Sequence, residues 1–146
     1  SNSVSVVNLS LVIHELPTSV AKQVILEAHR ILQPGGQLWL SEMDFESTAY
    51  KAQRENALLF SLLRATEPYL DDYADGMQDL RQFIVDIFDS TKITAATGRH
   101  YALVAEKSLE NDDVDREKIF EDYRFREDGS YAVEDTHLKP WESKDG

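Results

Sequence analysis

The pattern of apolar and polar positions in the N-terminal part of the chain predicts a strand followed by a helix. Residues Val4–Ile13 form a nearly continuous apolar run that is rich in β-branched side chains. Such a run is typical of a strand buried on both faces of a parallel sheet, although a buried helix leaves the same pattern. From Thr18 or Ser19, either of which can cap a helix, apolar residues recur at helical spacing. This stripe contains Val20, Val24, Ala28, Ile31 and Leu32.

A turn of proline and glycine separates this helix from a second apolar segment. Pro34 lacks a backbone donor, and Gly35 and Gly36 tolerate positive φ, so this turn ends the helix. Residues Gln37–Met43 then read as a second short buried strand. A strand, a helix, a tight turn and a strand make a βαβ unit, which predicts two parallel strands joined by a right-handed crossover.

Amphipathic patterns continue as far as Glu106. Residues Ala49–Leu63 predict a helix that ends before Pro68, and residues 71–76 read as a polar loop. Thr91–Ala96 and His100–Glu106 predict the two strands of a hairpin, with Gly98 suited to a left-handed position in its turn. Between the loop and the hairpin, a short amphipathic helix is predicted from Leu80, Phe83, Ile84 and Ile87.

Charge divides the chain near Lys107. The 146 residues carry a formal net charge of −12. Residues 1–106 hold 8 basic and 14 acidic side chains and residues 107–146 hold 7 and 13, so each part has a net charge of −6. The shorter part therefore reads as an acidic tail, with a helix expected near Val114–Tyr123. Its apolar and aromatic residues include Ile119, Phe120, Tyr123, Phe125, Tyr131 and Trp141.

Composition excludes several classes of function. With no cysteine, the chain has no disulfide framework, thiolate metal site or cysteine nucleophile. The acidic charge argues against binding to nucleic acid or anionic lipid. No apolar run is long enough to span a membrane and no signal peptide is present, so a soluble intracellular protein is expected, in the cytoplasm or the plastid stroma. The chain lacks an initiator methionine, which predicts either a processed start or a fragment.

Four stretches resemble the second half of the class I, Rossmann-like, S-adenosylmethionine-dependent methyltransferases. Leu11–Pro17 resembles the fourth strand of that family and the His-bearing loop after it. Ala28–Gly36 resembles the signature from helix to fifth strand, in which the Pro-Gly-Gly turn recurs. Ala65–Tyr73 is similar to a segment of a plant, algal and cyanobacterial branch, and Gly98–Glu106 resembles the seventh strand.

The resemblance implies an α/β fold for residues 1–106, a methyltransferase-like half domain followed by the acidic extension 107–146. It would be a partial Rossmann-like sheet of strands four to seven with flanking helices. The expected strand order is fourth, fifth, seventh, sixth, with the last pair antiparallel. By the same resemblance, Ser10, Leu11 and His14 would lie beside the methionine and sulfonium end of the cofactor.

The chain differs from the family in the segment that binds the cofactor. No glycine-rich loop follows a first strand, because Gly35, Gly36 and Gly76 are the only glycines among the first 97 residues. In the family, that loop approaches the methionine moiety and an acidic residue holds the ribose. No cofactor is therefore expected for this chain alone, and S-adenosylmethionine is expected only if the missing half is supplied.

His14 is the candidate catalytic residue, because imidazole titrates near neutral pH. The alternative is a structural role at the end of the strand. The His14-Glu15 pair does not make a zinc protease motif, since Thr18 stands where the second histidine would be. Glu42, Asp44 and Glu46 could form a magnesium cluster, but carboxylates that face solvent at a strand end are the favoured interpretation. No metal site is predicted.

Two functions are compatible with this sequence. The favoured one is a non-catalytic accessory or interaction subunit of a larger assembly, built on a methyltransferase-like domain. The alternative is a fragment of an active small-molecule methyltransferase whose N-terminal half is removed or supplied by another chain. Under either, Val4–Ile13 would be an unpaired apolar edge strand that invites another protein subunit. The aromatic residues of the tail could dock on the same partner, or the tail could be a disordered solubilising extension.

Overall fold

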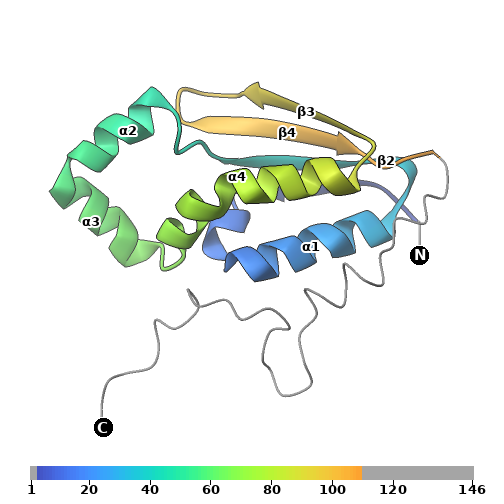
Figure 1. The fold of residues 1–146 in the computed structure, drawn as a ribbon, viewed down its shortest axis with the longest axis horizontal. Helices are drawn as coiled ribbons and strands as arrows, with labels where there is room; N and C mark the ends of the chain where they lie inside the picture. The colour runs from blue at the N-terminus through green and yellow to red at the C-terminus, as the bar shows by residue number, and fades with distance from the viewer. Residues whose placement is uncertain (1–2, 110–146) are drawn as a thin grey trace, which may run out of the picture.

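In the computed structural model, which describes residues 3–109, four strands form a mixed sheet in the order β1-β2-β4-β3 (Figure 1). The strands are β1 (Val4–Ser10), β2 (Leu32–Met43), β3 (Ser90–Ala95) and β4 (His100–Glu106). β1 and β2 are parallel, and β4 is antiparallel to both of its neighbours. The α/β fold, the strand order and the antiparallel last pair are confirmed. The tail helix and the tail aromatic residues predicted from the sequence lie outside the described residues.

The first strand is shorter than its apolar run predicted. β1 ends at Ser10, and Leu11 takes a positive φ of 54° that turns the chain out of the sheet. The backbone N–H of Leu11 still donates to the Ser41 carbonyl at 2.8 Å. The chain then makes one turn of 3-10 helix, η1 (Ile13–Glu15), which buries Ile13 in the core. Ile13, the last residue of the run, therefore anchors a turn instead of extending the strand, while Leu11 and Val12 are exposed.

Both ends of helix α1 (Thr18–Ile31) are stabilised by residues distant in sequence. Neither Thr18 nor Ser19 is the N-cap; Pro17 is, and the Asp72 carboxylate accepts from the backbone N–H of Thr18 at 2.6 Å. At the other end, the Lys107 ammonium donates to the carbonyl of His29 in the last turn at 2.8 Å and to that of the C-cap Leu32 at 2.6 Å. These charges complement the helix dipole. The buried stripe agrees with the predicted one only in part. Ala28 and Leu32 are buried as predicted, but Val20, Val24 and Ile31 are half-buried. The other buried positions of α1 include Ala21, Ile25, Leu26 and His29.

The Pro-Gly-Gly segment interrupts strand β2 instead of preceding it. Val4 pairs with Leu32 and Val6 with Gln37, so the ladder contains a large bulge between these two pairs. Gly35 has a φ of 72°, which confirms the positive φ predicted for this turn. Hydrogen bonds of 3.0 Å and 2.9 Å join Gly35 and Gly36 to Lys107, so the bulge is fixed to the chain that follows β4.

Two short helices replace the single helix predicted for residues 49–63. They are α2 (Thr48–Glu55) and α3 (Ala57–Thr66), separated at Asn56, whose side chain accepts from the backbone N–H of Leu59. In Figure 1 this pair extends away from the sheet at one end of the molecule. No residue of α3 is buried, and its exposed apolar side chains include Leu58, Leu59 and Leu62.

Helix α4 (Leu70–Ile87) is longer than predicted, because the segment read as a polar loop is its first two turns. Together with α1 it covers one face of the sheet (Figure 1). Gly76 lies inside α4, and a Cβ atom there would sit 2.7 Å from Thr18 Oγ1. A glycine is therefore required where α4 passes the start of α1. The predicted apolar positions Leu80, Ile84 and Ile87 are buried in the core, and Phe83 packs against it.

The turn between β3 and β4 does not use Gly98 as predicted, since Gly98 lacks a positive φ. The Thr97 hydroxyl instead accepts from the backbone N–H groups of Arg99 and His100, at 3.2 Å and 3.1 Å. The turn is thus stabilised by the side chain of Thr97 and not by a glycine in the left-handed region.

The second face of the sheet carries no helix from the described residues (Figure 1). Trp39, Val6 and Val104 lie on it, with exposed fractions of 47%, 39% and 37%. We call this surface the bare face. It also carries polar residues, among them Asn8, Ser10, Gln37 and Ser41. Within residues 3–109, no helix has both the length and the apolar character needed to cross a membrane.

Candidate functional site

The predicted site residue His14 lies on η1, directly after the carboxyl end of β1, and is buried. Its Nδ1 is 2.7 Å from Oε2 of Glu42, near the end of the neighbouring strand β2. Because β1 and β2 are parallel, their carboxyl ends meet at one edge of the sheet. This edge is where open α/β sheets bind their ligands.

Glu42 does not face solvent, as the sequence had suggested, but is completely buried. Its Oε1 accepts from the backbone N–H groups of Val12 and Ile13, each at 2.7 Å, and its Oε2 accepts from that of Met43 at 3.3 Å. The turn out of β1 leaves these N–H groups without carbonyl partners, and a buried donor must be satisfied. Glu42 therefore fixes the backbone that carries His14 as well as the imidazole itself.

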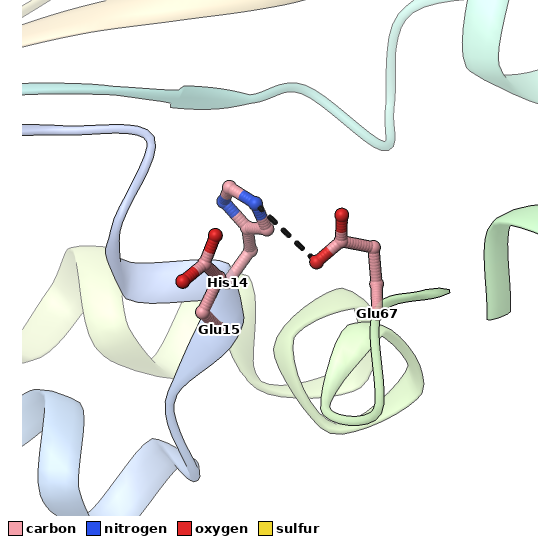
Figure 2. A group of neighbouring side chains, drawn as sticks. All are labelled: His14, Glu15 and Glu67. Atoms are coloured by element: carbon pink, nitrogen blue, oxygen red, sulfur yellow. Dashed lines mark ion pairs between the residues drawn. The ribbon is translucent and has the colours of Figure 1, made fainter. Parts of the chain in front are cut away.

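This arrangement determines which nitrogen of His14 is free. A carboxylate can only accept a hydrogen bond, so Nδ1 carries the proton in the bond to Glu42. In the neutral imidazole, Nε2 then presents its lone pair. Oε2 of Glu67 lies 3.9 Å from Nε2, as the dashed line in Figure 2 marks. Glu67 follows the last residue of α3 and its side chain is 25% exposed.

Nearby negative charges raise the pKa of His14 by more than its burial lowers it. Burial by itself lowers the pKa of the imidazole, because it disfavours the charged form. The hydrogen bond and negative charge of Glu42, with smaller contributions from Glu67 and Glu15, act in the opposite direction. The net result is a pKa raised above the ordinary value.

Aromatic residues of α4 and β4 form the wall behind His14. Tyr73 contacts the imidazole edge-on, with 6.3 Å between ring centroids. Its hydroxyl donates to the Met43 carbonyl at 2.9 Å and lies 3.3 Å from the hydroxyl of Tyr101. Burial raises the pKa of Tyr73 far above its usual range, so this side chain stays a neutral donor. The wall holds the end of β2 in place and thereby positions Glu42.

The other two predicted site residues lie at the same sheet edge but outside this cluster. Ser10 and Leu11 are exposed at the carboxyl end of β1. The Ser10 hydroxyl donates to Asn8 at 2.9 Å, and within residues 3–109 no hydrogen bond joins Ser10 or Leu11 to the His14 side chain.

Sequence reasoning missed the roles of Glu15, Glu42 and Glu67. One ligand atom from each of His14, Glu15 and Glu67 lies within 4.8 Å of the other two. A signal for Glu42 existed in the sequence, because a carboxylate at the end of a buried strand needs either solvent or donors. Glu67 left no such signal, since only the packing of the segment between α3 and α4 brings it to His14.

Comparison with known proteins supports the fold of the chain but identifies neither a family nor a function. No family model and no curated protein matches the chain. Among solved structures, it is similar to an O-methyltransferase family protein from Burkholderia thailandensis, with a TM-score of 0.54 and 19% identity over 74% of this chain and 31% of that one. A protein from Bordetella parapertussis described as a possible exported protein gives a TM-score of 0.50 and 14% identity, over 73% of this chain and 40% of that one.

A weaker similarity, with a TM-score of 0.45 and 16% identity, is found to a SAM-dependent methyltransferase from Methanosarcina mazei, over 75% of this chain and 61% of that one. The chain therefore spans less than two thirds of each of these proteins. The described residues share their α/β fold with the matched parts of the Burkholderia and Bordetella proteins.

Proposed function

We propose that this chain works as one half of a methyltransferase-type domain, within an assembly that supplies the complementary half. The single observation that carries the proposal is the bare face of the sheet. Trp39 and Val104 are paired neighbours on it, and each keeps more than a third of its surface in solvent. In α/β folds with parallel strands, helices normally cover both faces of the sheet.

The free edge of β1 supports the same conclusion. β1 pairs with β2 along one edge, and within residues 3–109 no strand pairs with its other edge. Unpaired N–H and C=O groups along such an edge favour the addition of another strand. We infer that the complementary half covers the bare face and extends the sheet beyond β1, whether it belongs to the same polypeptide or to another.

On this proposal the chain by itself has an accessory role and binds S-adenosylmethionine weakly. The described residues contain no glycine-rich turn after a strand other than the β2 bulge, which lies at the end of β2 opposite to His14. Ser10 and Leu11, both exposed at the carboxyl edge of β1, would contribute only one side of a cofactor site.

Titration calorimetry of the chain with S-adenosylmethionine tests this proposal. We expect no saturable heat at micromolar ligand. Saturable micromolar binding to a folded monomer would contradict the proposal, because the chain would then hold a complete cofactor site. Thermal melts with and without ligand give an independent measure, since a ligand that binds only the native state raises the melting temperature.

An active methyltransferase formed with the complementary half is the second candidate. It is favoured by the His14–Glu42 pair, which keeps an oriented imidazole at the ligand-binding edge of the sheet. In such a complex, the accessory role predicts that His14→Asn leaves methyl transfer unchanged. A catalytic role predicts a loss of turnover without a matching loss of assembly.

A further inference from the structure

His14, Glu15 and Glu67 place one imidazole and two carboxyl groups together, and Figure 2 shows both carboxyl groups turned toward the imidazole. One ligand atom from each residue lies within 4.8 Å of the other two. Ligand atoms that share one cation at about 2.0–2.2 Å lie roughly 3–4 Å apart. The cluster is therefore within small side-chain movements of a coordination shell, and exposed Glu15 and half-buried Glu67 are free to make them.

The imidazole is already prepared as a ligand. Histidines that bind metals commonly donate the other ring N–H to a carboxylate, which fixes the tautomer and the ring orientation. Glu42 provides this partner at 2.7 Å from Nδ1, and is itself held by three backbone N–H groups. Nε2 has no hydrogen-bond partner among residues 3–109 and faces Glu67.

The balance of charge also favours a cation. The single imidazole lies between Oε2 of Glu42, 2.7 Å from Nδ1, and Oε2 of Glu67, 3.9 Å from Nε2, and the Glu15 carboxylate belongs to the same cluster. Within residues 3–109, neither Glu15 nor Glu67 forms an ion pair with a lysine or an arginine. Glu67 instead has His14 as its partner, at 3.9 Å. A divalent ion would balance the carboxylates of Glu15 and Glu67, neither of which is paired with a lysine or an arginine within residues 3–109.

We propose that Nε2 of His14 and the carboxylates of Glu15 and Glu67 bind a divalent transition-metal ion, for which Zn²⁺ is the best match. One imidazole nitrogen and two carboxylate oxygens are ordinary Zn²⁺ ligands, whereas Mg²⁺ and Ca²⁺ prefer oxygen ligands alone. Three protein ligands leave a fourth position open for water or a ligand oxygen, as in catalytic zinc sites. Exposed Glu15 provides the path of entry.

This proposal goes beyond the methyltransferase-type function and does not depend on it. The ion would lie at the carboxyl edge of β1, where that function also expects its ligands. It assigns the lone pair of Nε2 to a metal, so His14 would not act as a general base while the ion is bound. No metal site was predicted because the sequence has no local metal-binding motif, whereas the ligands of this cluster come from two separate segments of the chain.

Calorimetric titration of the metal-free chain with ZnCl₂ is the first test. We expect one saturable site whose affinity falls at least roughly tenfold in Glu67→Gln, in Glu15→Gln and in the positioning variant Glu42→Gln. Glu55→Gln, which removes one exposed carboxylate of α2, is the matched control and should bind as the parent does. Other carboxylates of this acidic chain are expected to bind Zn²⁺ weakly in every variant to the same extent. A loss of affinity seen only in the site variants is therefore due to the proposed site.

Nitrogen-15 spectra of the histidine side chains locate the ion directly. The sequence has four histidines, and buried His29, in the last turn of α1, serves as an internal reference. We expect Zn²⁺ to shift the Nε2 resonance of His14 and to leave Nδ1 protonated. Unchanged affinity in the three glutamate variants, or a His14 resonance that ignores saturating Zn²⁺, would overturn the proposal. Melting curves without metal confirm that each variant is folded.

Discussion

At the scale of the residue, backbone geometry around the bulge of β2 leaves room for glycine alone. Gly35 has a φ of 72°, and a Cβ atom there would lie 2.9 Å from the Leu109 side chain. A Cβ atom at Gly36 would lie 2.8 Å from the Gln33 carbonyl oxygen, which is backbone and cannot rotate away. A larger residue is therefore disfavoured at Gly35 mainly by the backbone conformation, and at Gly36 by contact with the Gln33 carbonyl.

Gly35→Ala and Gly36→Ala should each lower the free energy of unfolding by about 1 kcal/mol or more. Gly98→Ala is the matched control, because Gly98 has no positive φ and nothing lies within 4 Å of its added Cβ. Urea denaturation of the three variants measures the differences. If Gly98→Ala lowers the free energy of unfolding as much as the other two substitutions do, the bulge does not specifically require glycine.

At the scale of the element, α1 depends on side chains from elsewhere for both of its ends. The Asp72 carboxylate accepts from the backbone N–H of Thr18 and from its hydroxyl, at 2.6 Å and 2.8 Å. Asp72 lies in the first turn of α4, so one residue joins the starts of two helices. Lys107 joins the opposite end of α1 to the chain after β4.

Asp72→Ala should destabilise the fold by about 1 kcal/mol, the usual cost of losing an N-terminal cap. Asp75→Ala is the control, because Asp75 is exposed on the same helix and has no capping contact. Thermal unfolding followed by circular dichroism measures both variants. Equal melting temperatures for the two would show that Asp72 does not cap α1.

At the scale of the whole molecule, exposed apolar side chains gather on two surfaces of the described residues 3–109. One is the bare face around Trp39, and the other is the row of leucines on α3. The bare face lies beside the free edge of β1, so it offers both apolar contact and backbone hydrogen bonds to a second chain. We therefore expect the isolated chain to self-associate through the bare face until the complementary half is supplied.

Light scattering should report oligomers for the parent chain and monomers for Trp39→Lys, while Leu58→Lys on α3 remains oligomeric. Amide hydrogen exchange along β1 should be fast in the monomeric variant, because one edge of this strand is open to solvent. A parent chain that is monomeric and exchanges slowly along β1 would contradict this expectation. If only Leu58→Lys is monomeric, the chain self-associates through α3 and not through the bare face.

The sequence by itself determined the order and type of most elements, because these depend on local patterns. A β-branched run, a helical stripe and a Pro-Gly-Gly turn led to a parallel pair of strands, and the hairpin was recognised from two short apolar segments. Gly35 or Gly36 was predicted to take a positive φ in the turn, and Gly35 does. His14 was identified as the candidate side chain at the carboxyl end of the first strand.

Only the tertiary structure decided how these elements end and which side chains meet. Glu42 is buried because the turn at Leu11 leaves donors that need an acceptor, and the sequence around Glu42 does not identify those donors. Segments read as a polar loop became the start of α4 because Asp72 and Gly76 fit against Thr18. Glu67 reaches His14 through the packing of α3 and α4. Such contacts join distant parts of the chain, so periodicity along the sequence carries no record of them.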